Sequence, residues 1–256
     1  NIMSIFIETN PNDPKKLFKN IGLSVIDFTT GKNTIYEVYS NKGNRDYNYS
    51  LDETFRFIQV YNPCEILIIV NETSENVDKI EGISNDYLKN YLNLSDTIVH
   101  YRNKDTINKE YSRIDYQATF LEKIFKSKND SLLSIIEFLD IELLPIATIS
   151  YIHLLDFAYT HNENIIQKIQ VPDIFKSQNY MILTNNSINQ LNVVSNTNTN
   201  TNSNVNSLLA VVNKATTSIG RRQLKDQLLN PICDPVEIEK RYTYTDTFYK
   251  NNNYMN

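Results

Sequence analysis

The sequence has few of the residues that mark disulfide, redox or metal chemistry. It contains two cysteines, three histidines and no tryptophan in 256 residues. Cys64 and Cys233 lie far apart and match no metal-binding or redox spacing. We therefore interpret both as buried or bystander thiols of a reducing, intracellular compartment. This does not distinguish cytoplasm, nucleus and mitochondrion.

The sequence also lacks a long apolar run and an excess of positive charge. No stretch approaches the roughly 20 apolar residues that a membrane-spanning helix needs, and no signal-peptide pattern is visible, so we expect no membrane partner. The formal net charge is −5, and residues 1–141 carry the acidic excess, which argues against a basic nucleic-acid surface. Hydrophobic residues make up 41% of the chain, which is typical of a globular protein.

The first 141 residues predict an α/β domain. Apolar runs at 2–8, 22–31 and 33–40 indicate three antiparallel strands, with Gly31 in the second turn. A helix should follow from Ser50, with Glu53 three residues later completing a capping box. The remaining runs predict strands at 65–70 and 97–102 and helices at 74–83, 86–92, 114–125 and 132–141. This order resembles the ribonuclease H-like fold, a mixed sheet with flanking helices.

A composition shift near Pro145 predicts a second, mainly α-helical domain over residues 142–256. An amphipathic helix is expected at 146–161, and a short strand, a turn and another extended piece at 180–194. The Asn/Thr-rich stretch 195–206 has no periodicity and predicts a flexible loop. The chain begins inside a strand pattern and ends in a helical one, so we expect a piece of a longer protein.

The segment 207–241 is the densest local pattern in the chain. It resembles the signature that opens the core, or lever, domain of the MutS mismatch-repair family. The matching residues are Ser207, Leu208, Thr217, Gly220, Arg222, Leu224, Leu228, Pro231, Ile238 and Arg241. The sequence departs from the family at Asn213, where Asp is usual, and at Ala215, where Thr is usual.

Two stretches in the first domain extend this resemblance. "GLSVIDFTTGK" and "YNPCEILI" resemble the connector domain that precedes the MutS core. The Tyr- and Asn-rich style is similar to the giant-virus and octocoral-mitochondrial branch. The resemblance implies a connector at 1–141, the beginning of the lever at 142–256, and a role in coupling ATP state to DNA clamping.

For the longer protein, the resemblance implies an ATPase that uses ATP and magnesium. It would bind mismatched double-stranded DNA as a homodimer, with a MutL-like partner at the connector. This chain itself should hold no catalytic, cofactor or metal residues. Its single Gly-Lys pair, Gly31-Lys32, lacks the upstream glycine and the following Ser or Thr of a phosphate-binding loop.

We interpret the segment 207–241 as a structural joint. Well-capped helices and firm packing suit a segment that transmits movement. The residues predicted to form the joint are Thr217, Gly220, Arg222, Pro231, Asp234 and Arg241. Arg222 should point inward or along a domain junction. The alternative is that Arg221, Arg222 and Lys225 form a phosphate-contacting cluster.

Two other functions stay open at this point. A ribonuclease H-like nuclease needs carboxylates that hold two metal ions, but Asp27 and Glu53 do not match that set. Magnesium-dependent cleavage would favour this reading. The other open function is a non-catalytic interaction module in another pathway. A phosphate-binding loop further along the longer protein would exclude it. His153 is expected to be a hydrogen-bonded, half-buried histidine rather than a ligand.

Overall fold

The structure is a computed structural model in which the chain forms two compact units, Asn1–Phe175 and Lys176–Asn256. The residues that it describes are 1–9, 18–40, 46–77, 79–80, 82–95, 97–125, 132–161, 168–175, 181, 183, 185–194 and 207–250. The predicted loop at 195–206 lies outside them. The first unit runs past residue 141, where the sequence suggested a domain boundary, because the next helix packs on the sheet.

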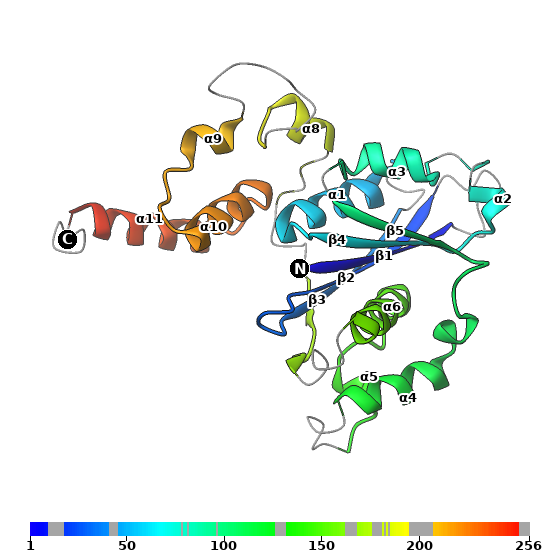
Figure 1. Cartoon of the computed structure of the whole chain (residues 1–256). Helices are drawn as coiled ribbons and strands as arrows, with labels where there is room; N and C mark the ends of the chain where they lie inside the picture. The colour runs from blue at the N-terminus through cyan, green and yellow to red at the C-terminus, as the bar shows by residue number, and fades with distance from the viewer. Residues whose placement is uncertain are drawn as a thin grey trace. The chain divides into compact units, whose positions relative to one another are not determined.

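A six-stranded mixed sheet forms the centre of the first unit (Figure 1). Its spatial order is β5-β4-β1-β2-β3-β6. The strands are β1 Ile2–Thr9, β2 Lys19–Ile26, β3 Asn33–Tyr39, β4 Glu65–Val70, β5 Ile98–Asn103 and β6 Asp173–Ile174. β2 runs antiparallel to β1 and β3, whereas β1, β4 and β5 are mutually parallel. The predicted antiparallel meander and the shared sheet of β4 and β5 are confirmed.

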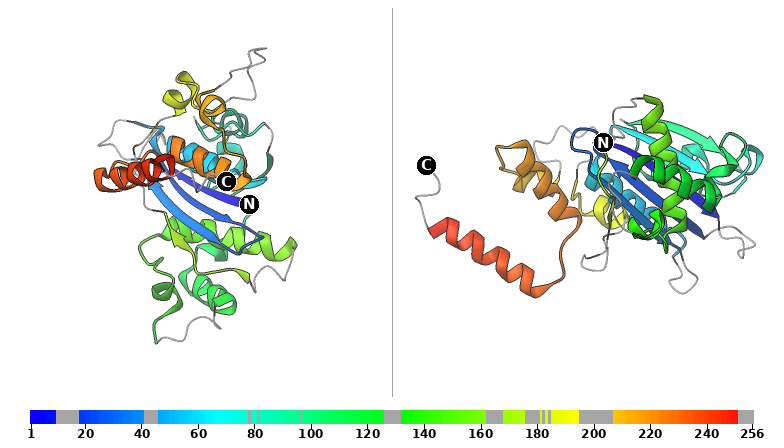
Figure 2. Two further views of the ribbon diagram at one scale, coloured as in Figure 1. Left: turned by 90° about the vertical axis from the view of Figure 1, so that its left-hand side faces the viewer. Right: turned by 90° about the horizontal axis from the view of Figure 1, so that it is seen from below.

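Helices cover both faces of this sheet (Figures 1 and 2). They are α1 Tyr49–Tyr61, α2 Ser74–Val77, α3 Asn85–Tyr91, α4 Ile114–Phe125, α5 Ile135–Phe138 and α6 Pro145–His161, with a 3-10 turn at Lys109–Ser112. α1 packs on β2 and β3 from one face, and α6 packs on β1, β2 and β3 from the other. α4 and α5 form an outer layer beyond α6, so α6 is enclosed on two sides.

Small residues let α6 approach the sheet closely. A Cβ atom added at Gly22 would lie 2.3 Å from the carbonyl oxygen of Ile146. The Ser24 hydroxyl lies 3.0 Å from that of Ser150, which also donates to the carbonyl of Ser4 at 2.9 Å. α6 was predicted to be amphipathic, but its buried residues lie all around the helix. The α4–α5 layer explains this difference, because it buries the side of α6 that would otherwise face water.

The predicted capping box at the start of α1 is wrong. The N-cap is Asn48, and Ser50 lies inside the helix, where its hydroxyl accepts a hydrogen bond from Ser40 at 2.8 Å. Glu53 is 1% exposed and accepts hydrogen bonds from Arg56 at 2.5 Å and from Tyr36 at 2.9 Å. The pair with Arg56 in the same helix and the tertiary hydrogen bond from Tyr36 therefore determine the position of Glu53, and the spacing from Ser50 does not.

The described part of the second unit is helical. Its helices are α8 Asn185–Gln190, α9 Leu208–Val212, α10 Ser218–Leu229 and α11 Pro235–Lys250. The expected strands around 180–194 are wrong at residues 185–190, which form α8. At the end of α8, the amides of Leu191 and Val193 donate to the carbonyls of Ser187 and Ile188, so the backbone there bonds locally, as in a helix.

Candidate functional site

The segment predicted as a joint forms three helices with defined starts. Ser207 caps α9, because its hydroxyl accepts a hydrogen bond from the amide of Ala210 at 3.2 Å. Thr217 caps α10 in the same way, accepting from the amide of Gly220 at 3.1 Å. These side chains satisfy amides that a helix start would otherwise leave without an intrahelical partner. Thr217 is therefore the N-cap of α10.

Gly220 lies in a tight helix start. A Cβ atom added there would lie 3.0 Å from the Thr217 hydroxyl and 3.2 Å from the Cβ of Ala215. The close neighbours of Gly220 therefore come from the preceding turn. In the part of the chain that the structure describes, they do not come from the backbone of another element.

The basic residues of α10 differ in their surroundings. The Nε of Arg221 donates to the carbonyl of Ala215 at 3.0 Å and ties α10 to the loop before it. Arg222 is exposed, so its predicted place at a domain junction stays a prediction for a longer protein. Burial lowers the pKa of Lys225. The three side chains therefore do not form one phosphate-binding cluster of equivalent residues.

The turn between α10 and α11 is held from both sides. The carbonyl of Pro231 accepts a hydrogen bond from the amide of Met181 at 2.7 Å. Asp234 starts α11, since its carboxylate accepts from the amide of Val236 at 3.0 Å. The carboxylate of Glu237, in the first turn of α11, lies 3.5 Å from the Nε of Arg241. Of the predicted joint residues, Thr217 and Asp234 thus lie at helix starts, Gly220 lies in the first turn of α10 and Pro231 lies between the helices. Arg222 and Arg241 lie in the second turns of α10 and α11.

Asp27, one of the carboxylates considered for a nuclease, serves its own turn. It accepts hydrogen bonds from the amide of Thr29 and the hydroxyl of Thr30, both at 2.9 Å. Partial burial opposes ionisation, but these hydrogen bonds leave the pKa of Asp27 below its ordinary value. Glu53, the other candidate, is the buried partner of Arg56. Among the described residues, no group of three or more His, Cys, Asp and Glu side chains could hold a metal ion.

His153 is more deeply buried than the sequence suggested. It is 1% exposed, and neither ring nitrogen has a hydrogen-bond partner among the described residues. The ring packs against Phe6 and Tyr111. Burial lowers the pKa of His153 to about 3, with a further contribution from the charge of Arg102. The expected hydrogen-bonded, half-buried histidine is therefore wrong, and this side chain is part of the core.

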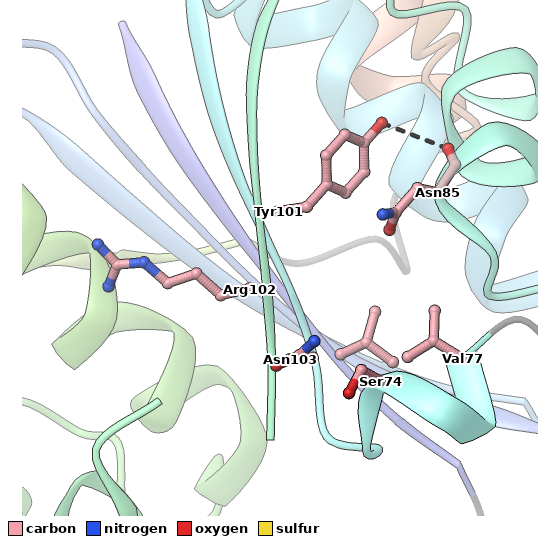
Figure 3. Close-up of a pocket in the computed structure, with 7 residues that line it drawn as sticks. Ser74, Val77, Asn85, Tyr101, Arg102 and Asn103 are labelled. Carbon is pink, nitrogen blue, oxygen red and sulfur yellow. Dashed lines mark hydrogen bonds between the residues drawn. The ribbon is translucent and has the colours of Figure 1, made fainter. Parts of the chain in front are cut away.

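Sequence reasoning missed a polar cavity at the carboxyl ends of β4 and β5 (Figure 3). Its volume is about 200 Å³, and Ser74, Asn85, Tyr101 and Asn103 contribute polar groups to its wall. The Tyr101 hydroxyl donates to the carbonyl of Asn85 at 3.3 Å. The carboxyl ends of parallel strands are a common place for ligands, and the strand order that creates this one becomes visible only in the fold.

Comparison with known proteins agrees with the helical segment. The family model for MutS domain III matches residues 186–256, which include α9, α10 and α11. The DNA mismatch repair protein mutS homolog L359 of Acanthamoeba polyphaga mimivirus is 32% identical over 265 residues, covering 98% of this chain and 23% of that protein.

Bacterial and mitochondrial relatives give the same result. The DNA mismatch repair protein MutS of Caldanaerobacter subterraneus is 29% identical over 236 residues, which cover 91% of this chain and 23% of the relative. The mitochondrial mutS homolog of Sarcophyton glaucum is 30% identical over 142 residues, which cover 53% of this chain and 13% of the relative.

These findings define a mixed α/β unit followed by helices of the MutS domain III type. The chain belongs to the MutS family. It spans about a quarter of the length of the two relatives that match it over most of its residues. Among the described residues, the structure contains no helix that is both long and apolar enough to cross a membrane.

Proposed function

We propose that this chain is the connector and the beginning of the lever of a MutS-like protein that acts in DNA mismatch repair. Residues 1–141, together with α6 packed on their sheet, would be a ribonuclease H-like connector that serves as a scaffold, and the lever would begin after this first unit. The mixed sheet with helices on both faces supports the first assignment. The domain III match at 186–256 supports the second.

The observation that carries the proposal is the set of capped helices inside the matched segment. Ser207, Thr217 and Asp234 each bind an amide at the start of the helix that follows. A helix whose first amides are satisfied moves as a unit rather than fraying, which suits the transmission of movement between distant sites. The segment would therefore act mechanically, as a joint of the lever.

The chemistry of the proposed activity would reside in the longer protein. That protein would bind mismatched double-stranded DNA as a homodimer and hydrolyse ATP with magnesium outside this chain. A MutL-like partner would contact the connector. In this division of roles, the joint residues Thr217, Gly220, Arg222, Pro231, Asp234 and Arg241 transmit nucleotide state to the DNA-clamping region.

Arg222 provides the sharpest test, because it is exposed in this chain while Arg221 is hydrogen-bonded. Arg222→Ala should leave the thermal stability of the 256-residue chain unchanged. In the longer protein, it should retain basal ATP hydrolysis and DNA binding but lose the stimulation of one by the other. ATPase assays with and without mismatched DNA, together with DNA-binding titrations, would measure this coupling.

Arg221→Ala is the matched control. It removes the hydrogen bond to Ala215 and should lower the stability of the chain modestly, by about 1 kcal/mol, with coupling retained. Normal stimulation in Arg222→Ala would contradict the assigned role of Arg222 in the joint. Loss of DNA binding in Arg221→Ala at unchanged stability would indicate a phosphate-contact site instead.

A further inference from the structure

The strand β5 forms one edge of the sheet. It pairs with β4 on one side, and the strand order places no strand on its other side within the described residues. Five of the six residues of β4 are buried, whereas none of the six residues of β5 is. The outer side of β5 is therefore accessible in the described structure.

At this edge, the backbone amides and carbonyls of two residues point away from β4. The amide of Ile98 donates to Cys64, beside β4, so by strand alternation Val99 and Tyr101 direct their amides and carbonyls outward. Within the described ranges, these outward groups make no backbone hydrogen bond. At both ends of β5, the backbone amides bond within turns. The amide of Thr97 donates to the carbonyl of Leu94, and the amide of Asn103 donates to the Thr106 hydroxyl.

The side chains flanking this edge differ between the two faces of the sheet. Tyr101 and Arg102 lie on opposite sides of β5 (Figure 3). On the Tyr101 side is the polar cavity of about 200 Å³, which is smaller than the ~300–1,000 Å³ of typical small-molecule sites and has room for about one side chain. On the other side, the Arg102 guanidinium lies 5.9 Å from the centre of the Phe157 ring.

Arg102 provides a positive charge beside this edge. No carboxylate among the described residues forms an ion pair with it. His100, on the same face of β5, is already bound to Glu65 at 2.7 Å. A second copy of β5, with the sequence Ile-Val-His-Tyr-Arg-Asn, brings no carboxylate to this edge. The charge therefore favours an acidic segment over a second copy of the chain.

We propose that the edge of β5 binds an extended acidic peptide segment of another protein, which adds to the sheet as a further strand. Its backbone pairs with Val99 and Tyr101, one carboxylate faces Arg102, and a neighbouring side chain enters the cavity beside Tyr101. Strand addition draws its affinity from main-chain hydrogen bonds and its specificity from alternating side-chain sites. This inference uses the first unit alone and does not depend on the proposed joint.

The test uses the full 256-residue chain and three synthetic peptides. The first is an eight-residue peptide of alternating valine and threonine with one central glutamate. The second carries lysine in place of glutamate, and the third is the glutamate peptide with methylated backbone nitrogens. Amide hydrogen exchange reports protection of Val99 and Tyr101, while fluorescence titration gives the affinities.

The glutamate peptide should slow exchange at Val99 and Tyr101, and the methylated peptide should not bind. The lysine peptide should bind about fivefold more weakly, the scale of an exposed ion pair, and Arg102→Glu should reverse this preference. Val99→Pro removes one outward amide at an edge position where proline is tolerated. It should weaken the glutamate peptide about tenfold through lost backbone pairing.

Several results would overturn the proposal. Unchanged exchange at Val99 and Tyr101 with the glutamate peptide would exclude strand addition at this edge. Equal affinity of the glutamate and lysine peptides would exclude the role of Arg102. If Val99→Pro does not fold, Arg102→Glu still tests peptide binding at this edge, because a retained preference for glutamate would contradict the proposal. A dimer in sedimentation that protects both amides without peptide would show that a second copy occupies the edge.

Discussion

At the scale of single residues, His153 makes the stability of the first unit depend on pH. Its neutral ring is buried with a pKa of about 3, whereas an unfolded histidine has a pKa near 6.5. The unfolded state therefore binds the extra proton first as the pH falls. The contribution of the neutral His153 ring to the free energy of unfolding is fully present above about pH 6.5. It declines as the pH falls toward 3.

We expect the free energy of unfolding to fall by roughly 2 kcal/mol between pH 7 and pH 5 because of this residue. His153→Phe should remove that part of the pH dependence, since phenylalanine has no proton to gain. Urea unfolding at both pH values would measure the difference between the two proteins. His161→Phe is the control, because His161 is exposed. An unchanged slope in His153→Phe would contradict the assignment.

Gly22 shows how one missing side chain determines a helix position. A Cβ atom at this place would approach the carbonyl carbon of Ile146 to 2.5 Å and the amide nitrogen of Ala147 to 2.7 Å. Backbone atoms cannot rotate away as a side chain can. Gly22→Ala should therefore displace α6 and destabilise the unit by about 1–3 kcal/mol, the cost typical of overpacking.

Chemical denaturation of Gly22→Ala would measure this loss. Gly220→Ala is the matched control, because its nearest atoms belong to the side chains of Thr217 and Ala215, at 3.0 Å and 3.2 Å. Its effect should be much smaller. Equal stability of Gly22→Ala and Gly220→Ala would contradict this expectation, because α6 would then be displaced without a loss in the free energy of unfolding.

At the scale of elements, Glu37 joins β3 to the start of α6. Its carboxylate accepts hydrogen bonds from the amides of Ile146 and Ala147, both at 2.7 Å. Pro145 begins this helix, a position where its missing amide costs nothing. A strand residue thus caps a helix that follows more than a hundred residues later. Burial raises the pKa of Glu37, and the amide hydrogen bonds oppose that rise.

Glu37→Ala should cost about 1–2 kcal/mol, because it leaves two helix-start amides without their acceptor. Glu37→Gln keeps one acceptor oxygen and should lose less. Thermal unfolding of both variants would establish the order. A glutamine variant less stable than the alanine variant would contradict a capping role.

The sequence predicted most elements of the first unit, because their patterns are local. Strands at 65–70 and a helix at 114–125 appear with the predicted bounds. The errors arise where distant residues decide. Glu53 accepts a hydrogen bond from Tyr36 on β3 rather than capping α1, and the two-residue strand β6 forms only because β3 offers an edge. For the same reason, the β5 edge and its cavity could not be predicted.

The candidate joint was predictable in part for a related reason. Caps at Thr217 and Asp234 depend on residues two or three positions away, which spacing reveals. The surroundings of Arg221 and Arg222 depend on the turn of the loop before α10. Periodicity alone does not place Ala215 beside Arg221.

At the scale of the whole molecule, the first compact unit should require residues beyond 141. α6 supplies much of the core cluster on its face of the sheet, including Tyr151, Leu154 and Leu155. A chain truncated after residue 141 exposes that face and should be unfolded or aggregated. A chain truncated after residue 175 should unfold cooperatively. Circular dichroism melts of the two would show the difference, and a cooperative melt of the shorter chain would contradict it.

The full 256-residue chain is also expected to be catalytically silent. The sequence has no phosphate-binding loop, and Asp27 and Glu53 are committed to a turn and to a buried pair. ATPase and magnesium-dependent nuclease assays should therefore show no turnover. Cleavage that Asp27→Asn or Glu53→Gln abolishes would contradict the scaffold assignment.

The close packing of α6 on β1 and β2 has a consequence for how the protein is made. The ribosome synthesises β1 and β2 first, but their cover begins only at Pro145. The α6 face of this hairpin is therefore bare while more than a hundred further residues emerge. Contacts that close over such a separation form slowly. The nascent chain thus carries an open apolar surface until α6 has been made, and the time spent in that state sets its exposure to aggregation.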